Sequence, residues 1–228
     1  MVEVPARASD AASEATSIAP EIFRPYTDLS VDFIYNLLFC DNVSLFRGPD
    51  NAAPDEPWKT LLQEPPDARA LRVLIADEAN ESRLRALACH RLQATGAQLA
   101  ATRLFGVIVE VPLSQGLEVL AAFADGQVRH IHHTGKMSFF EPGPGEVNAR
   151  ARRLVTAAQP RVERLGRHTQ TRLAPPVGDR IRMSFLTSNG LYCGEGRYEA
   201  MQKDEHAGPI MAAALALLQT IAMQAAGR

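Results

Sequence analysis

Several residue types are scarce in this chain of 228 residues, and each shortage weakens the case for a class of protein. Its three cysteines, at positions 40, 89 and 193, form no CxxC pair and no disulfide pattern, so we expect a reducing compartment. Only three of the 24 basic residues are lysines, which we attribute to codon bias. A net charge of −2 favours neither nucleic acid nor an anionic membrane as a partner. We therefore expect a cytoplasmic protein of bacterial type.

Long apolar runs are also scarce. Residues 1–20 are rich in alanine, serine and proline and contain no apolar core of a signal peptide, so they predict a flexible leader before a single domain over 21–228. The segment from Ala207 to Gly227 has no charged residue, but it is rich in alanine and contains two glutamines and a threonine. This composition predicts a buried or subunit-facing helix rather than a membrane span.

Two turn dipeptides, Asp125-Gly126 and Asn189-Gly190, each separate a pair of β-rich runs. Such dipeptides are typical of two-residue hairpin turns, because both turn positions need a positive φ. Further β-rich runs cover residues 103–111 and 136–140, and helical periodicity appears between the hairpins. The sequence therefore predicts an α+β fold with a mainly antiparallel sheet of four to six strands, packed by three to four helices.

The apolar run ALRVLIA at residues 70–76 predicts a further strand, followed by a helix over about 80–95. With Asp77 and Glu78 at its end, this stretch resembles the opening of a response-regulator receiver domain, where an acidic pair holds magnesium. The resemblance ends downstream, because Glu110 stands where the family has its phosphoryl-acceptor aspartate. Two antiparallel hairpins also contradict the parallel sheet of that family, so we do not expect a receiver domain.

Three of the six histidines gather in RHIHHTGK, residues 129–136. If Asp125-Gly126 forms a two-residue turn, His130 and His132 share one face of the sheet, and His133 lies opposite Glu118 on the other. A pair of histidines on one strand face can bind a metal side by side. No third ligand is placed nearby by local spacing, so we expect an ordinary Glu118–His133 pair, no metal and no cofactor.

The second hairpin contains Cys193 and Glu195 in the segment LYCGEGRYE. The predicted register places both on one face, and Gly194 and Gly196 on the opposite face. The glycines either line a small-ligand pocket or admit the terminal helix, and we favour the helix. Cys193 would need a nearby histidine or a positive environment to act as a nucleophile.

Two functions follow as hypotheses. The first is a non-catalytic interaction or assembly module, a homodimer, because no catalytic constellation has diagnostic spacing and the charge-free helix suits packing against a twin. The alternative is a small-molecule enzyme or ligand-binding protein. Its polar site would form where the two hairpins meet, with histidines near a carboxylate available for acid–base chemistry. The residues of that site would be His130, His132, Cys193 and Glu195.

Overall fold

A computed structural model of the protein describes residues 21–47, 55–97, 99, 101–164 and 172–226. The expected leader, residues 1–20, lies outside these ranges. Within them the chain forms seven α-helices, one short 3-10 helix and six β-strands. In chain order these elements are α1 (Leu29–Leu37), η1 (Val43–Phe46), α2 (Trp58–Leu62), α3 (Ala68–Ala76), α4 (Ser82–Ala94), β1 (Leu104–Leu113), β2 (Gly116–Phe123), β3 (Val128–Ile131), β4 (Met137–Phe140), α5 (Glu146–Val162), β5 (Arg180–Thr187), β6 (Gly190–Arg197), α6 (Tyr198–Lys203) and α7 (Ala207–Ala226).

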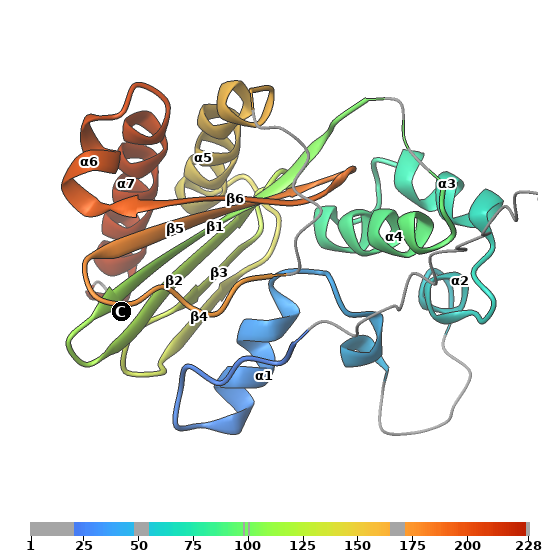
Figure 1. The fold of residues 1–228 in the computed structure, drawn as a ribbon, viewed down its shortest axis with the longest axis horizontal. Helices are drawn as coiled ribbons and strands as arrows, with labels where there is room; N and C mark the ends of the chain where they lie inside the picture. Colours follow the sequence, from blue (N-terminus) through green and yellow to red (C-terminus); the bar gives the residue numbers. More distant parts are fainter. Residues whose placement is uncertain (1–20, 48–54, 98, 100, 165–171, 227–228) are drawn as a thin grey trace, which may run out of the picture.

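All six strands form one antiparallel sheet in the order β4-β3-β2-β1-β5-β6. The predicted α+β class with an antiparallel sheet is confirmed, although helices are more numerous than the three to four expected. Helices α1 to α4 lie on one side of the sheet and α5 to α7 on the other (Figure 1). We call these sides the N-terminal face and the C-terminal face, because each is covered by a separate part of the chain.

Helix α3 replaces the strand expected over residues 70–76, so that prediction is wrong. The Asp67 side chain accepts hydrogen bonds from the backbone N–H groups of Arg69 and Ala70, which caps the helix. Leu71 and Ile75, one helical turn apart, are buried, whereas Val73 between them is 64% exposed. The apolar run thus buries one stripe of a helix, and its short length concealed the helical period.

The β2–β3 hairpin has a turn that is one residue longer than predicted. Its loop has three residues, Ala124 to Gly126, and Gly126 adopts a φ of +94° while its N–H donates to the carbonyl of Phe123. Asp125 is hydrogen-bonded to Ser82, the first residue of α4. Its carboxylate accepts from the Ser82 N–H at 2.7 Å, and its own N–H donates to the Ser82 hydroxyl at 3.0 Å.

This longer turn shifts the register of β3 by one residue. His130 pairs with Leu120 instead of Ala121, and a shift of one inverts every side chain. His130 therefore lies on the C-terminal face with Leu120 and Val128. The prediction that placed His130 beside Phe123 and Val119 is wrong for this reason.

The β5–β6 hairpin turns at Ser188-Asn189 instead of Asn189-Gly190. Ser184 pairs with Cys193, two positions away from the expected partner. A shift of two residues keeps each side chain on its predicted side, so Cys193 and Glu195 still share one face. That face is the N-terminal one.

Each face of the sheet carries its own apolar core. The largest fully buried side chains of the N-terminal face include Tyr35, Phe39, Phe105 and Phe123, packed between β1–β2 and helices α1 to α4. On the C-terminal face, α5 and α7 pack against each other and over the sheet. Burying one such side chain contributes about 1.5–3 kcal/mol, so both layers stabilise the sheet.

Helix α7 is long and apolar enough to cross a membrane by length and composition, a test that core helices of water-soluble proteins also pass. Its residues Ile210, Ala214, Leu217 and Ile221 follow helical spacing and are buried against the rest of the C-terminal face. Its outer side exposes Leu215 and other apolar residues.

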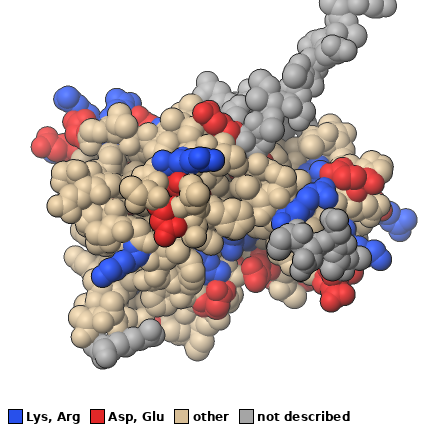
Figure 2. Space-filling view, turned by 90° about the horizontal axis from the view of Figure 1, so that it is seen from below, with Lys and Arg blue, Asp and Glu red and all other residues tan. Residues whose placement is uncertain are grey.

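Elsewhere on the surface, acidic and basic side chains are interspersed over the face seen in Figure 2.

Candidate functional site

Glu118, on β2, is the centre of a polar cluster on the C-terminal face. Its Oε1 atom lies 2.6 Å from Nε2 of His130. Its Oε2 atom accepts the backbone N–H of His133 at 2.8 Å and lies 3.1 Å from Nδ1 of the same residue. Burial alone would raise the pKa of Glu118, but these hydrogen bonds outweigh it and lower the pKa to about 2. Glu118 is therefore a carboxylate at neutral pH.

The turn between β3 and β4 positions the other two histidines. Gly135, with a φ of +85°, donates its N–H to the His132 carbonyl, and the His132 N–H donates to the backbone carbonyl of Lys136. Nδ1 of His132 lies 2.8 Å from the Thr134 hydroxyl oxygen. The rings of His132 and His133 are 3.9 Å apart between centroids and tilted by 39°. We call Glu118, His130, His132 and His133 the histidine cluster.

Three members of the cluster, Glu118, His132 and His133, offer one ligand atom each within 4.8 Å of one another. The predicted pair of His130 and His132 is not this set, because Nε2 of His130 is engaged with Glu118. The Glu118–His133 contact expected from the sequence is present. The histidines are not divided between the two faces as predicted, because the register places all three around one carboxylate.

A groove of about 580 Å³ adjoins the cluster, between the sheet and helices α6 and α7. Glu118, His132 and His133 stand among its lining residues, and most of the others are apolar. Its volume lies in the range of about 300–1,000 Å³ that is usual for small-molecule sites. The apolar lining consists of Val109, Val111, Leu113, Ile181, Tyr198, Met211, Ala212, Ala214, Leu215 and Leu218.

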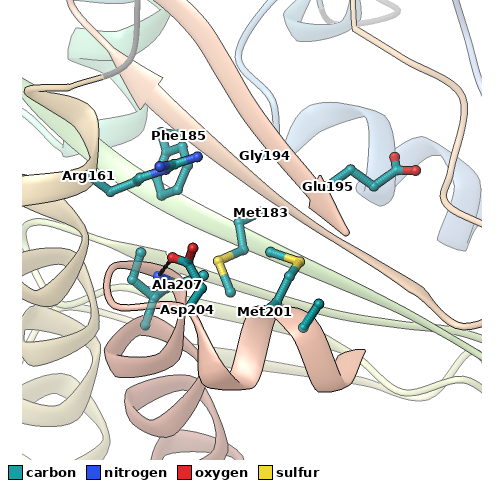
Figure 3. A pocket seen from close by; sticks show the side chains of 10 residues that line it. Arg161, Met183, Phe185, Gly194, Glu195, Met201, Asp204 and Ala207 are labelled. Atoms are coloured by element: carbon teal, nitrogen blue, oxygen red, sulfur yellow. Dashed lines mark hydrogen bonds between the residues drawn. The ribbon is translucent and has the colours of Figure 1, made fainter. Parts of the chain in front are cut away.

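A smaller cavity of about 190 Å³ lies between β5, β6 and the helices of the C-terminal face (Figure 3). Gly194 forms part of its wall, and a Cβ atom there would meet nothing within 4 Å. At Gly196 a Cβ would lie 2.9 Å from Cγ of Met201. One glycine therefore lines a cavity, and the other admits α6 in place of the terminal helix that we expected. The Glu195 side chain turns away from this cavity (Figure 3).

The structure does not bring His130 and Glu195 together. They project from opposite faces of the sheet, and β2, β1 and β5 separate their strands. Four strand spacings amount to about 19 Å, so no shared site forms from His130, His132, Cys193 and Glu195. Burial raises the pKa of the Cys193 thiol, so this cysteine is not activated as a nucleophile.

Glu195 belongs instead to an ion-pair network. Burial would raise its pKa, but hydrogen bonds from Arg180 and Arg182 outweigh that effect and lower it. Arg182 also donates to the carbonyls of Leu173 and Ala174. The carboxylate is therefore bound on the N-terminal face by two guanidinium groups.

Sequence reasoning missed a buried carboxyl group, that of Glu110 on β1. Its side chain is fully buried on the N-terminal face, and its Oε1 accepts the Tyr35 hydroxyl at 2.7 Å. Burial raises its pKa, and the Tyr35 hydrogen bond offsets this only in part. The signal was a single charge inside the apolar run RLFGVIVEV, because an acid in the middle of a buried strand needs a partner.

Arg172 was also missed, and it fastens the chain on the N-terminal face. It donates to the Glu21 carbonyl at 2.7 Å and to the Asn36 side chain. Its guanidinium lies 4.4 Å from the centroid of the Phe39 ring and 3.7 Å from an Asp41 oxygen. No local sequence pattern predicts the contact between Arg172 and Asn36, which are 136 positions apart.

Comparison of the chain with protein-family models, curated proteins and solved structures gives no match in any of the three. The functional argument therefore depends on the geometry of the histidine cluster and the groove beside it.

Proposed function

We propose that the protein binds a small molecule with an apolar body and a polar group. The body lies in the groove between the sheet and α7, and the polar group bonds to His132 and His133. The observation that carries this proposal is that an apolar groove of about 580 Å³ includes three polar members of one cluster in its wall. This is the ligand-binding alternative raised by the sequence, at a different site.

The two ends of such a ligand would contribute in different ways. Removing apolar surface from water contributes about 25 cal/mol per Å², so the apolar wall supplies affinity. The polar end fixes the orientation of the ligand. Nδ1 of His132 bonds to the Thr134 hydroxyl, and Nδ1 of His133 bonds to Glu118. In both residues Nε2 is therefore the nitrogen that can meet a hydroxyl, carbonyl or carboxylate group.

Titration with a dansyl-labelled fatty acid tests this proposal by fluorescence. Leu215, in the groove wall, is 52% exposed, and Val73, on α3 at the other face, is 64% exposed. The Leu215→Arg variant should bind the probe at least about tenfold more weakly, the factor that corresponds to 1.4 kcal/mol. The matched Val73→Arg variant should bind like the unmodified chain. Equal affinity of all three proteins, or no binding by the unmodified chain, would refute the proposal that the groove binds the ligand.

The second candidate function is the assembly module, a homodimer formed through the outer side of α7. The observation that favours it is the exposure of Leu215 and of Met223, which is 76% exposed, in a helix without charged residues. A stable interface buries about 800 Å² on each partner, and exposed apolar surface on a helix suits that role.

Light scattering at micromolar concentration tests the dimer. Met223 does not line the groove, so Met223→Arg should convert a dimer to a monomer and leave binding of the labelled fatty acid unchanged. A monomeric unmodified chain would contradict the assembly module without affecting the ligand-binding proposal.

A further inference from the structure

We infer that Glu118, His132 and His133 bind one divalent transition-metal ion of the zinc class at the polar part of the groove. The inference concerns the same cluster as the proposed ligand-binding function and names a cofactor for it. Metal binding can nevertheless be measured without any organic ligand, so the two proposals fail separately.

The donor set has the chemistry that such an ion requires. Two imidazoles and one carboxylate are the three protein ligands of many open zinc sites, in which bonds to nitrogen and oxygen are about 2.0–2.2 Å long. Ligand atoms around a tetrahedral ion with such bonds are about 3.5 Å apart. The atoms of Glu118, His132 and His133 lie within 4.8 Å of one another, so closure by about 1 Å through side-chain rotation would complete the site.

The surroundings of the three ligands also suit a metal. Histidine ligands are normally oriented by a hydrogen bond at their other ring nitrogen, and Nδ1 of His132 has the Thr134 hydroxyl at 2.8 Å. His130 holds the second oxygen of Glu118 at 2.6 Å. Among the described residues that line the groove there is one carboxylate, that of Glu118, and no lysine or arginine. The charge at this position therefore favours a cation.

Three protein ligands leave a further coordination position, and the groove is the space beside it. An oxygen of the bound molecule, from a carboxylate or carbonyl group, would coordinate the ion there while the apolar body lies along α7. This arrangement narrows the ligand class to molecules that combine an oxygen donor with an apolar chain or ring.

The test is titration of the chelator-treated full chain with ZnCl2 by calorimetry and with CoCl2 by visible absorption. We expect one ion per chain and the absorption bands of a four-coordinate Co²⁺ site. The variants His132→Ala and His133→Ala should each weaken binding at least about tenfold.

His206→Ala is the matched control, because His206 lies beside Arg164 and outside the cluster. It should bind metal like the unmodified chain, and circular dichroism should show all variants folded. The inference is overturned if no stoichiometric ion binds at micromolar concentration, or if the double variant His132→Ala/His133→Ala binds as tightly as the control. Fatty-acid binding without metal binding would overturn the inference of a metal ion and leave the ligand-binding proposal intact.

Discussion

The two faces of the sheet have opposite effects on the pKa of a carboxyl group. Glu110 on β1 and Glu118 on β2 are on neighbouring strands and project to opposite faces. Glu110 has one hydrogen-bond donor, Tyr35, and burial raises its pKa. Glu118 bonds to the ring of His130 and to both the ring and the backbone N–H of His133. Its pKa is lowered to about 2. The supply of donors decides the direction in which each pKa moves.

The contrast extends to what surrounds each carboxyl group. On the N-terminal face, Arg172 and Arg182 are buried and donate to backbone carbonyls of other segments. On the C-terminal face, His132 and His133 line an open groove. Polar groups of the first kind maintain the fold, whereas those of the second kind can meet a ligand. This difference is the reason why we propose a ligand-binding site on the C-terminal face and not on the other.

Removing a buried arginine of the N-terminal face should have the largest effect. Arg172→Ala should lower the free energy of unfolding by about 3–5 kcal/mol, because it leaves the half-buried partner Asp41 without its cation. Urea unfolding followed by circular dichroism measures the change. Arg180→Ala, which removes a half-exposed guanidinium, should cost less than about 1 kcal/mol. Similar losses in the two variants would contradict a special role for Arg172.

A neutral residue at Glu118 should have the next largest effect. Because the folded pKa lies below the ordinary 4.5, the carboxylate stabilises the fold above pH 4.5, and this contribution is lost as the pH falls toward 2. Glu118→Gln should therefore cost about 2 kcal/mol at pH 7 and progressively less below pH 4.5. A loss that stays constant between pH 7 and pH 3 in urea titrations would contradict this account of the hydrogen bonds.

The same exchange at Glu110 should have a smaller effect of opposite sign. Its folded pKa is raised, so ionisation costs stability as the pH rises from 4.5 through the folded value. Glu110→Gln keeps an acceptor for the Tyr35 hydroxyl and removes that cost, and should gain on the order of 1 kcal/mol at pH 7. Near pH 4 the two proteins should unfold at similar urea concentrations. A variant that is less stable at pH 7 would show that the charge of Glu110 supports the fold.

The hairpins show how far local sequence determines a site. Each turn dipeptide marked a hairpin, and both registers were wrong, by one residue at Asp125 and by two at Asn189. An error of two leaves side chains on their predicted faces, so Cys193 and Gly194 were placed correctly. An error of one inverts them, and for this reason His130 was assigned to the wrong face.

The missed part of the site depended on contacts between distant segments. Ser82 of α4 holds the turn at Asp125, and the groove needs α7 to lie over strands that precede it by about 90 residues. Periodicity and turn propensity describe neighbours in sequence, so they identified the six strands and the helices α4, α5 and α7. They carry no information about a bond from Arg172 to Asn36 or about the wall that α7 provides.

The division of the two faces between the two parts of the chain also has a consequence during synthesis. Every helix of the N-terminal face precedes β1, so α1 and α4 leave the ribosome before there is a sheet to cover them. At 5–20 residues per second, the apolar side of α1 waits on the order of ten seconds for β1 and β2 to follow. The nascent chain therefore exposes Tyr35, Phe39 and Leu87 to chaperones and to other chains during that interval.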